Sequence, residues 1–318
     1  MNFSSYFLII FLSLLVSCAG PVEESYDDIS SNVVDLDSSS SEKAPPTIGS
    51  ESDVSAVGVG PKPIGPNRVG QDEKNPSVWA LVLSPGLNRV ICHAVAVRAL
   101  YEKGIRFNII TGSGMGSIVA AYLAQGTTPE IIEWRFHKFF QKSEGMKPFS
   151  KNWIERVEKD LLKDFEGKKI QNTKITLLVP VYNELEKKVD YLRRGDLHKS
   201  LLENVNLRAR VPGKANSVIV YDKLDSSKLI SVGAQKIVEI DALGRKVKFE
   251  GSADYLFGIY GRWSSVPKEQ NENHYLMELP IADFSLDSTK DLPEYLRMSY
   301  LYVRDNSVDI KENYLSRN

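Results

Sequence analysis

The sequence predicts an α/β domain, a three-layer arrangement with a mostly parallel sheet between helices, preceded by a long disordered linker. Two observations lead to this prediction. From Val78 to the C-terminus, short apolar runs alternate with segments of helical periodicity, which is typical of a parallel sheet covered on both faces. Residues 18–77 are instead rich in Ser, Asp, Glu, Gly and Pro, with too little apolar surface to offset the entropy lost on ordering.

The N-terminus is predicted to direct the chain to the bacterial cell envelope. Residues 6–16 form an apolar run too short to span a bilayer, as in the apolar core of a secretory signal peptide. The next residues, Leu15-Val16-Ser17-Cys18, resemble the bacterial lipobox. This resemblance implies a signal peptide over residues 1–17, a lipid on Cys18 that makes the membrane a partner, and, from the non-acidic Ala19, an outer-membrane location. An ordinary cleaved signal or a short anchor is the alternative.

Composition narrows the remaining classes of partner and cofactor. The 318 residues include 40 Lys and Arg and 41 Asp and Glu, so charge gives no reason to expect nucleic acid as a partner. Cys18 and Cys92 are the two cysteines, and acylation of Cys18 would leave no intrachain disulfide. We expect no cofactor and no metal site, because His137, His198 and His274 lie in unrelated segments without metal-like spacing.

The elements of the domain follow from their apolar patterns. Strands are predicted at residues 78–83, 107–110, 175–179, 218–221 and 236–240, and helices at 92–101 and 117–124, the second ending at Gly126. Six apolar residues predict one further helical face: Trp153, Ile154, Val157, Leu161, Leu162 and Phe165. We expect Cys92 and His93 to pack within their helix, and Trp134, Phe136, Phe139 and Phe140 to form core rather than a membrane wedge.

Two glycine-containing loops carry the functional argument. Ser84-Pro85-Gly86-Leu87-Asn88-Arg89 connects the first strand to its helix, and Gly112-Ser113-Gly114-Met115-Gly116 connects the second strand to the next helix. Their order and spacing resemble patatin-like phospholipases, which have a glycine-rich loop ending in Arg-Gly and then a Gly-x-Ser-x-Gly elbow. Residues 195–201 and 233–241, a final strand at 275–280 and a helix at 294–303 extend the resemblance more weakly. It implies one patatin-like domain over residues 78–318 and lipid acyl hydrolysis by a Ser-Asp dyad.

The residues that would perform this chemistry depart from the family pattern. The nucleophile position is Gly114, which has no side-chain oxygen to form an acyl-enzyme. Ser113 is one residue early on a tight turn, and a misplaced nucleophile is costly. The base would be Asp222, with Asp225 as an alternative, and neither is followed by the family's glycine.

The oxyanion loop departs as well. Pro85 has no N–H to donate, and Leu87 adds bulk where the family has glycine. The candidates for binding an oxyanion or another anion are Gly86, Leu87, Arg89, Gly114 and Met115. A plain strand-to-helix connection without a ligand is the alternative for the second loop.

Together these departures predict an envelope-anchored, catalytically impaired pseudoenzyme that binds lipid, either fatty acid or phospholipid, or a protein partner that the sequence does not identify. Two alternatives stay open. One is an active lipid acyl hydrolase using Ser113 and Asp222, and the other is a structural interaction module of the envelope.

Overall fold

The computed structural model describes residues 77–183, 188–205, 226–244, 247–249 and 271–315. All of them belong to one compact unit, Gly70–Asn318. The predicted signal peptide and linker, the predicted strand at 218–221, and Asp222 and Asp225 lie outside the described residues.

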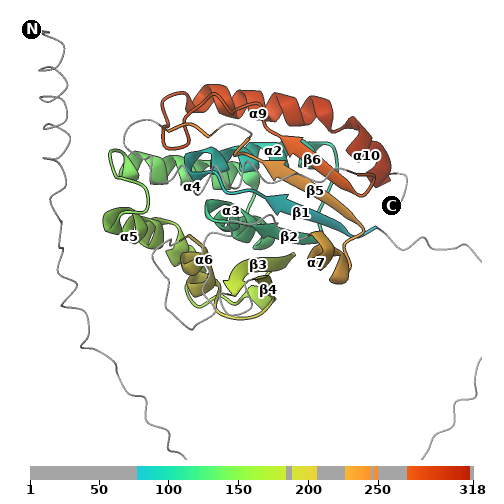
Figure 1. The fold of residues 1–318 in the computed structure, drawn as a ribbon, viewed down its shortest axis with the longest axis horizontal. Coiled ribbons are helices and arrows are strands. Elements are labelled where there is room, and N and C mark those ends of the chain that lie inside the picture. Colours follow the sequence, from blue (N-terminus) through green and yellow to red (C-terminus); the bar gives the residue numbers. More distant parts are fainter. Residues whose placement is uncertain (1–76, 184–187, 206–225, 245–246, 250–270, 316–318) are drawn as a thin grey trace, which may run out of the picture. The chain divides into compact units, whose positions relative to one another are not determined.

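The described residues form a sheet whose strands are ordered β4-β3-β2-β1-β5-β6 (Figure 1). Its strands are β1 (Trp79–Leu83), β2 (Ile109–Gly112), β3 (Thr176–Asn183), β4 (Lys188–Leu192), β5 (Lys236–Asp241) and β6 (His274–Glu278). Every neighbouring pair is parallel except β3 and β4, so a single antiparallel strand forms one edge. The predicted α/β class with a mostly parallel sheet is confirmed, and β4 is an addition that the sequence did not predict.

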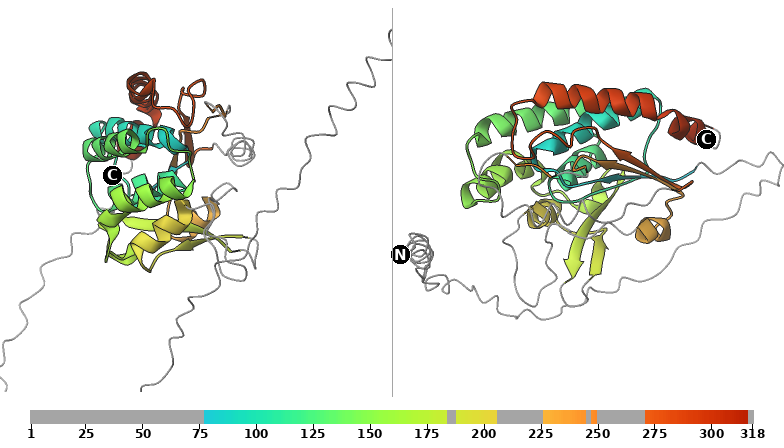
Figure 2. Two further views of the ribbon diagram at one scale, coloured as in Figure 1. Left: turned by 90° about the vertical axis from the view of Figure 1, so that its left-hand side faces the viewer. Right: turned by 45° about the horizontal axis from the view of Figure 1, so that its top comes forward.

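Helices flank this sheet. The α-helices are α2 (Ile91–Glu102), α3 (Met115–Ala124), α4 (Pro129–Ser143), α5 (Lys151–Asp160), α6 (Leu197–Val205), α7 (Ser226–Ser231), α9 (Leu292–Asn306) and α10 (Val308–Leu315), and the 3₁₀ helices are η1 (Leu87–Val90), η2 (Leu162–Phe165) and η3 (Ile170–Asn172). Helices α2, α4 and α9 lie side by side, while α3 packs on β2 (Figures 1 and 2). Within the described ranges no helix is both long enough and apolar enough to cross a membrane.

The strands β1 and β5 and the helix α3 form the buried centre of the domain. All five residues of β1 and all six of β5 are buried, as expected for parallel strands covered on both faces. Helix α3 is buried along its whole length, which places the turn that precedes it at the centre of the domain.

The helical face predicted over residues 153–165 is broken. Helix α5 ends at Asp160, and residues 162–165 form the separate 3₁₀ helix η2. Trp153, Val157, Leu161, Leu162 and Phe165 are all buried, although they do not belong to one helix.

The aromatic cluster on α4 was predicted correctly for three of its four members. Phe136, Phe139 and Phe140 are buried, and the Phe139 ring meets the Trp153 ring edge-on at 5.8 Å between centroids. The prediction for Trp134 was wrong, because its side chain is 55% exposed and the Lys138 ammonium lies 3.9 Å from its ring centroid. Trp134 lies on the outer side of α4, and its exposure is a consequence of helix geometry rather than of residue type.

Candidate functional site

A sharp turn between β2 and α3 forms the centre of the candidate site. Gly114 is the N-cap of α3 and has φ 53° and ψ −131°, a conformation that side-chain-bearing residues rarely adopt. The turn is held on both sides, because the Ser113 N–H donates to the Leu83 carbonyl at 3.0 Å and the Ser117 hydroxyl donates to the Gly114 carbonyl at 2.6 Å. This is the strand-to-helix geometry in which an elbow exposes its central residue.

The two flanking glycines are required by close backbone packing. A Cβ on Gly116 would lie 2.4 Å from the Ser84 carbonyl oxygen, and one on Gly112 would lie 2.5 Å from the Gly116 carbonyl oxygen. No side chain fits at these distances without moving the backbone. The chain therefore has the backbone and the small flanking residues of an elbow, with glycine at its centre.

The amide of Asn204 on α6 engages this centre. Its Oδ1 accepts a hydrogen bond from the Gly114 N–H at 2.6 Å, and its Nδ2 donates to the Pro180 carbonyl at 2.7 Å. The Asn204 side chain is fully buried. Sequence reasoning missed this residue, and the signal was a polar side chain on the same helical face as the buried Leu197 and Leu201.

Of the predicted catalytic pair, Ser113 lies within the described residues. Ser113 is fully buried, and its hydroxyl has no hydrogen-bond partner in the part of the chain that the structure describes. Asp222 lies outside the described residues. The structure therefore locates Ser113 next to the elbow centre and leaves its proposed pairing with Asp222 as a prediction.

In the loop after β1, Leu87 has a backbone conformation that is typical of glycine. Leu87 has φ 46°, in the left-handed region that costs a non-glycine residue about 1–2 kcal/mol, and its side chain is buried. Two N–H groups of the loop have hydrogen-bond partners within the domain. The Asn88 N–H donates to the Leu286 carbonyl at 3.0 Å, and the Arg89 N–H donates to the Gly86 carbonyl at 2.8 Å. These two N–H groups are not directed at a ligand.

Arg89 has structural partners. Its buried guanidinium donates to the Leu243 carbonyl at 2.6 Å, to the Ala282 carbonyl at 3.2 Å and to the Phe284 carbonyl. Burial lowers the pKa of Arg89 to about 10, so it stays protonated at neutral pH. Through these contacts Arg89 joins the β1 loop to the segments after β5 and β6, and its predicted role in anion binding stays a prediction.

His93 on α2 is also structural. Its Nε2 lies 2.9 Å from the Ser84 carbonyl oxygen, so this nitrogen must carry the proton. Burial lowers the pKa of His93 to about 4, which keeps the ring neutral at physiological pH. The Ser84 hydroxyl in turn accepts from the Ala242 N–H at 2.9 Å, so the end of β1 is tied to the end of β5.

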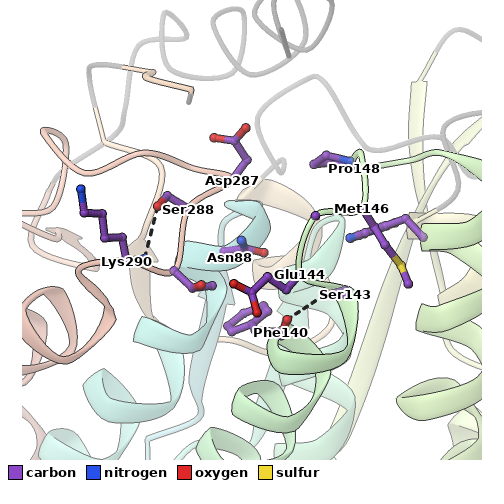
Figure 3. Close-up of a pocket in the computed structure, with 12 residues that line it drawn as sticks. Asn88, Phe140, Ser143, Glu144, Met146, Pro148, Asp287, Ser288 and Lys290 are labelled. Carbon is purple, nitrogen blue, oxygen red and sulfur yellow. Dashed lines mark hydrogen bonds between the residues drawn. The ribbon is translucent and has the colours of Figure 1, made fainter. Parts of the chain in front are cut away.

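A cavity of about 400 Å³ adjoins the β1 loop (Figure 3). It is lined by Asn88 of the loop, by the end of α4 with the turn after it, by Trp153 of α5, and by residues 287–290 before α9. Asn88 follows β1 closely, so the cavity lies toward the carboxyl ends of the parallel strands, where open α/β sheets commonly bind ligands.

The family model described as patatin-like phospholipase matches residues 81–239. Similar solved structures include VipD from Legionella pneumophila, with TM-score 0.42 and 11% identity over 76% of this chain and 68% of VipD. They also include ExoU in its heterodimeric complex with SpcU, from the type III secretion system of Pseudomonas aeruginosa, with TM-score 0.37 and 15% identity over 76% of this chain and 53% of ExoU. No curated protein sequence matches the chain.

Proposed function

The chain belongs to the patatin-like phospholipase family, and from this premise we propose that it is a catalytically impaired member that binds lipid at the bacterial envelope. The observation that carries the proposal is the elbow, which keeps its backbone conformation and both flanking glycines but has Gly114 where a nucleophile would stand. The proposed ligand is fatty acid or phospholipid.

Loss of hydrolysis follows from the chemistry of acyl transfer, which needs a nucleophile, a base and oxyanion donors in one place. Gly114 supplies no nucleophile, and its N–H already donates to Asn204. Pro85 supplies no N–H in the loop that would bind the oxyanion. These departures affect separate parts of the site, so restoring one of them would not restore the reaction.

Retention of lipid binding is supported by what is kept. The elbow keeps a conformation that side-chain-bearing residues rarely adopt, together with both flanking glycines. The cavity beside Asn88 has buried aromatic side chains, Phe140 and Trp153, among its lining residues. A site of this kind suits an amphiphile with a polar end and an apolar end.

Anchoring at the envelope is supported by the sequence. Cys18 ends a lipobox-like segment, and residues 19–77 would form a tether long enough for the domain to return to the membrane surface. We propose the outer membrane as the location. Replacement of Cys18 by Ser should move the full-length protein from the membrane fraction of cells to the soluble fraction or leave it as unprocessed precursor.

A second candidate is an active hydrolase that uses Ser113. The observation that favours it is the Ser113 hydroxyl, which has no hydrogen-bond partner among the described residues and lies next to the elbow centre. A shift of the turn by one residue would bring this hydroxyl to the nucleophile position, with Asp222 as its base.

One experiment separates the two candidates. Full-length protein in non-ionic detergent is assayed for fatty-acid release from mixed micelles of phospholipid and from short-chain esters, beside its Ser113→Ala and Asp222→Ala variants, and fatty-acid binding is measured in parallel. We expect all three proteins to release no product while the wild type binds lipid. Hydrolysis by the wild type that disappears in either variant would overturn the pseudoenzyme and establish the Ser113 enzyme. Absence of both hydrolysis and lipid binding would contradict the whole proposal.

A further inference from the structure

A cavity of about 660 Å³ lies at the end of the sheet opposite the elbow. It is lined by Thr176 and Leu177 at the start of β3, whereas the elbow follows the last residue of β2. Because Thr176 pairs with Ile109, the first residue of β2, the cavity lies at the amino ends of these parallel strands and the elbow at their carboxyl ends. The cavity is therefore separate from the candidate site described above.

The cavity forms because β4 does not extend along the whole of β3. Strand β4 ends at Leu192, opposite Val179, so the first three residues of β3 have no partner in β4. After β4 the chain pairs instead with the segment around η3, where the Ile170 N–H donates to the Gly195 carbonyl at 3.0 Å. This change of partner opens a gap between the start of β3 and the turn that follows β4.

Two adjacent arginines of this turn, Arg193 and Arg194, line the cavity. Both are exposed, and neither forms an ion pair within the described ranges. The described residues that line the cavity include no acidic residue. Of the two nearest carboxylates in the sequence, Asp190 lies further along β4, and Asp196 has the Lys169 ammonium at 3.3 Å. The cavity therefore carries two positive charges that no carboxylate of the described residues balances.

From these charges we propose that the cavity binds a phosphate monoester of a small organic molecule. Such an ester carries close to two negative charges at neutral pH and has three terminal oxygens that accept hydrogen bonds. Two guanidinium groups match this charge, and each can donate two parallel hydrogen bonds to it. A carboxylate or a sulfonate has a single charge and would leave one arginine unbalanced. The proposal concerns a site apart from the elbow and does not depend on the proposed function.

Neutral donors and a fixed turn accompany the two arginines. The Gln171 Oε1 accepts from the Gly195 N–H at 3.0 Å, so its Nε2 is the donor that this lining residue offers a ligand. Thr176, whose hydroxyl can also donate, is exposed and lines the cavity. Gly195 has φ 128°, a conformation that favours glycine, and its N–H and carbonyl both bond residues 170–171. These bonds fix the backbone of the turn that provides the arginines.

The rest of the lining suits the organic part of the ester. Apolar side chains come from Ile170, Leu177 and Leu192, and the ring of Tyr191 adds to them. Ile170 and Leu177 are buried, while Tyr191 and Leu192 are half-buried. Small-molecule sites commonly combine an apolar lining with a few polar groups, and the cavity volume falls within their usual range. An ester with a ring therefore fits better than inorganic phosphate, which would leave the apolar lining without a contact.

The test uses isothermal titration calorimetry on the full-length protein in non-ionic detergent. The soluble probes are phenyl phosphate, benzenesulfonate, which has the ring and three oxygens but a single charge, and inorganic phosphate, which has no ring. Mixed micelles of phosphatidic acid test whether a lipid is the source of the phosphate. The variants are Arg193→Met and Arg194→Met. The matched control is Arg297→Met, because Arg297 is an exposed residue of α9 outside the cavity that forms no ion pair within the described ranges.

We expect the wild type to bind phenyl phosphate about tenfold more tightly than benzenesulfonate, because the second charge strengthens the contact with one arginine. Arg193→Met and Arg194→Met should each weaken phenyl phosphate binding about tenfold, since each removes one charge-assisted contact. Arg297→Met should bind as the wild type does. Inorganic phosphate should bind more weakly than phenyl phosphate.

Other results would overturn the proposal in distinguishable ways. If phenyl phosphate does not bind, or if Arg193→Met and Arg194→Met behave like Arg297→Met, the site is wrong. If benzenesulfonate binds as tightly as phenyl phosphate, the cavity does not select a doubly charged group and the phosphate assignment is wrong. If phosphatidic acid binds and phenyl phosphate does not, the soluble ester is wrong as the ligand. Each of these results leaves the proposed function of the elbow standing.

Discussion

At the scale of single residues, the buried side-chain amide of Asn204 is the hydrogen-bond partner of the Gly114 N–H at the centre of the elbow. We expect Asn204→Ala to lower the free energy of unfolding by about 2–4 kcal/mol, because the Gly114 N–H and the Pro180 carbonyl would both lose a buried partner. Urea denaturation followed by circular dichroism measures the change. The control is Asn306→Ala, since the exposed Asn306 amide donates to the Tyr302 carbonyl of its own helix. Equal effects of the two substitutions would contradict the role assigned to Asn204.

Leu87 shows how two opposing effects at one residue are decided by magnitude. Its left-handed backbone costs about 1–2 kcal/mol relative to glycine. Its side chain is 1% exposed, and burial of a leucine side chain contributes roughly 1.5–3 kcal/mol. Burial therefore offsets the strain, and the loop can keep a glycine-like conformation without a glycine. The same side chain occupies space that a glycine would leave open beside the elbow.

At the scale of elements, α4 separates its aromatic residues onto two faces with different consequences. We expect Trp153→Ala, in the neighbouring α5, to lower the free energy of unfolding by about 3–5 kcal/mol, because the ring packs among Phe139 and Phe149 in the core. Trp134→Ala on the outer face of α4 should cost less than about 1 kcal/mol, since it removes an exposed ring and its contact with Lys138. Thermal unfolding of both variants provides the comparison. A larger loss for Trp134→Ala would mean that its surface is covered.

The success of the sequence prediction also differed by element. The turn between β2 and α3 was predicted because an apolar run, a glycine pattern and a helical run follow one another without a gap, and each part has a local cause. The break at Leu161 and the antiparallel strand β4 were not predicted, because the first depends on tertiary packing and the second on pairing with β3. The exposure of Trp134 likewise depends on which side of α4 faces the core.

The same limit applies to the site. Gly114 could be identified from spacing alone, because the elbow is a local motif. Asn204 and the carbonyl partners of Arg89 could not be identified in that way, since they are separated by 90 residues from Gly114 in the first case and by 154 or more from Arg89 in the second. Contacts over such distances are determined by how the strands are ordered in the sheet. The carbonyl partners of Arg89 therefore became known only with the fold.

At the scale of the whole molecule, the buried His93, which connects α2 to the end of β1, makes the stability of the fold sensitive to acid. Burial lowers the pKa of His93 to about 4 from 6.5, so the unfolded chain binds this proton more tightly than the folded one. The stability associated with neutral His93 is complete above pH 6.5 and is lost as the pH falls from 6.5 to 4. At pH 4.5 the loss relative to pH 7 should be about 2 kcal/mol.

This last prediction is checked by urea denaturation at pH 7 and pH 4.5 of the wild type and of His93→Gln, which keeps an amide donor for the Ser84 carbonyl but does not titrate. The variant retains every other ionisable group, so their contributions cancel in the difference between the two proteins. We expect the wild type to lose about 2 kcal/mol more than the variant on acidification. Parallel losses would mean that His93 is protonated in the folded protein, and the buried connection from α2 to the end of β1 would then need a different explanation.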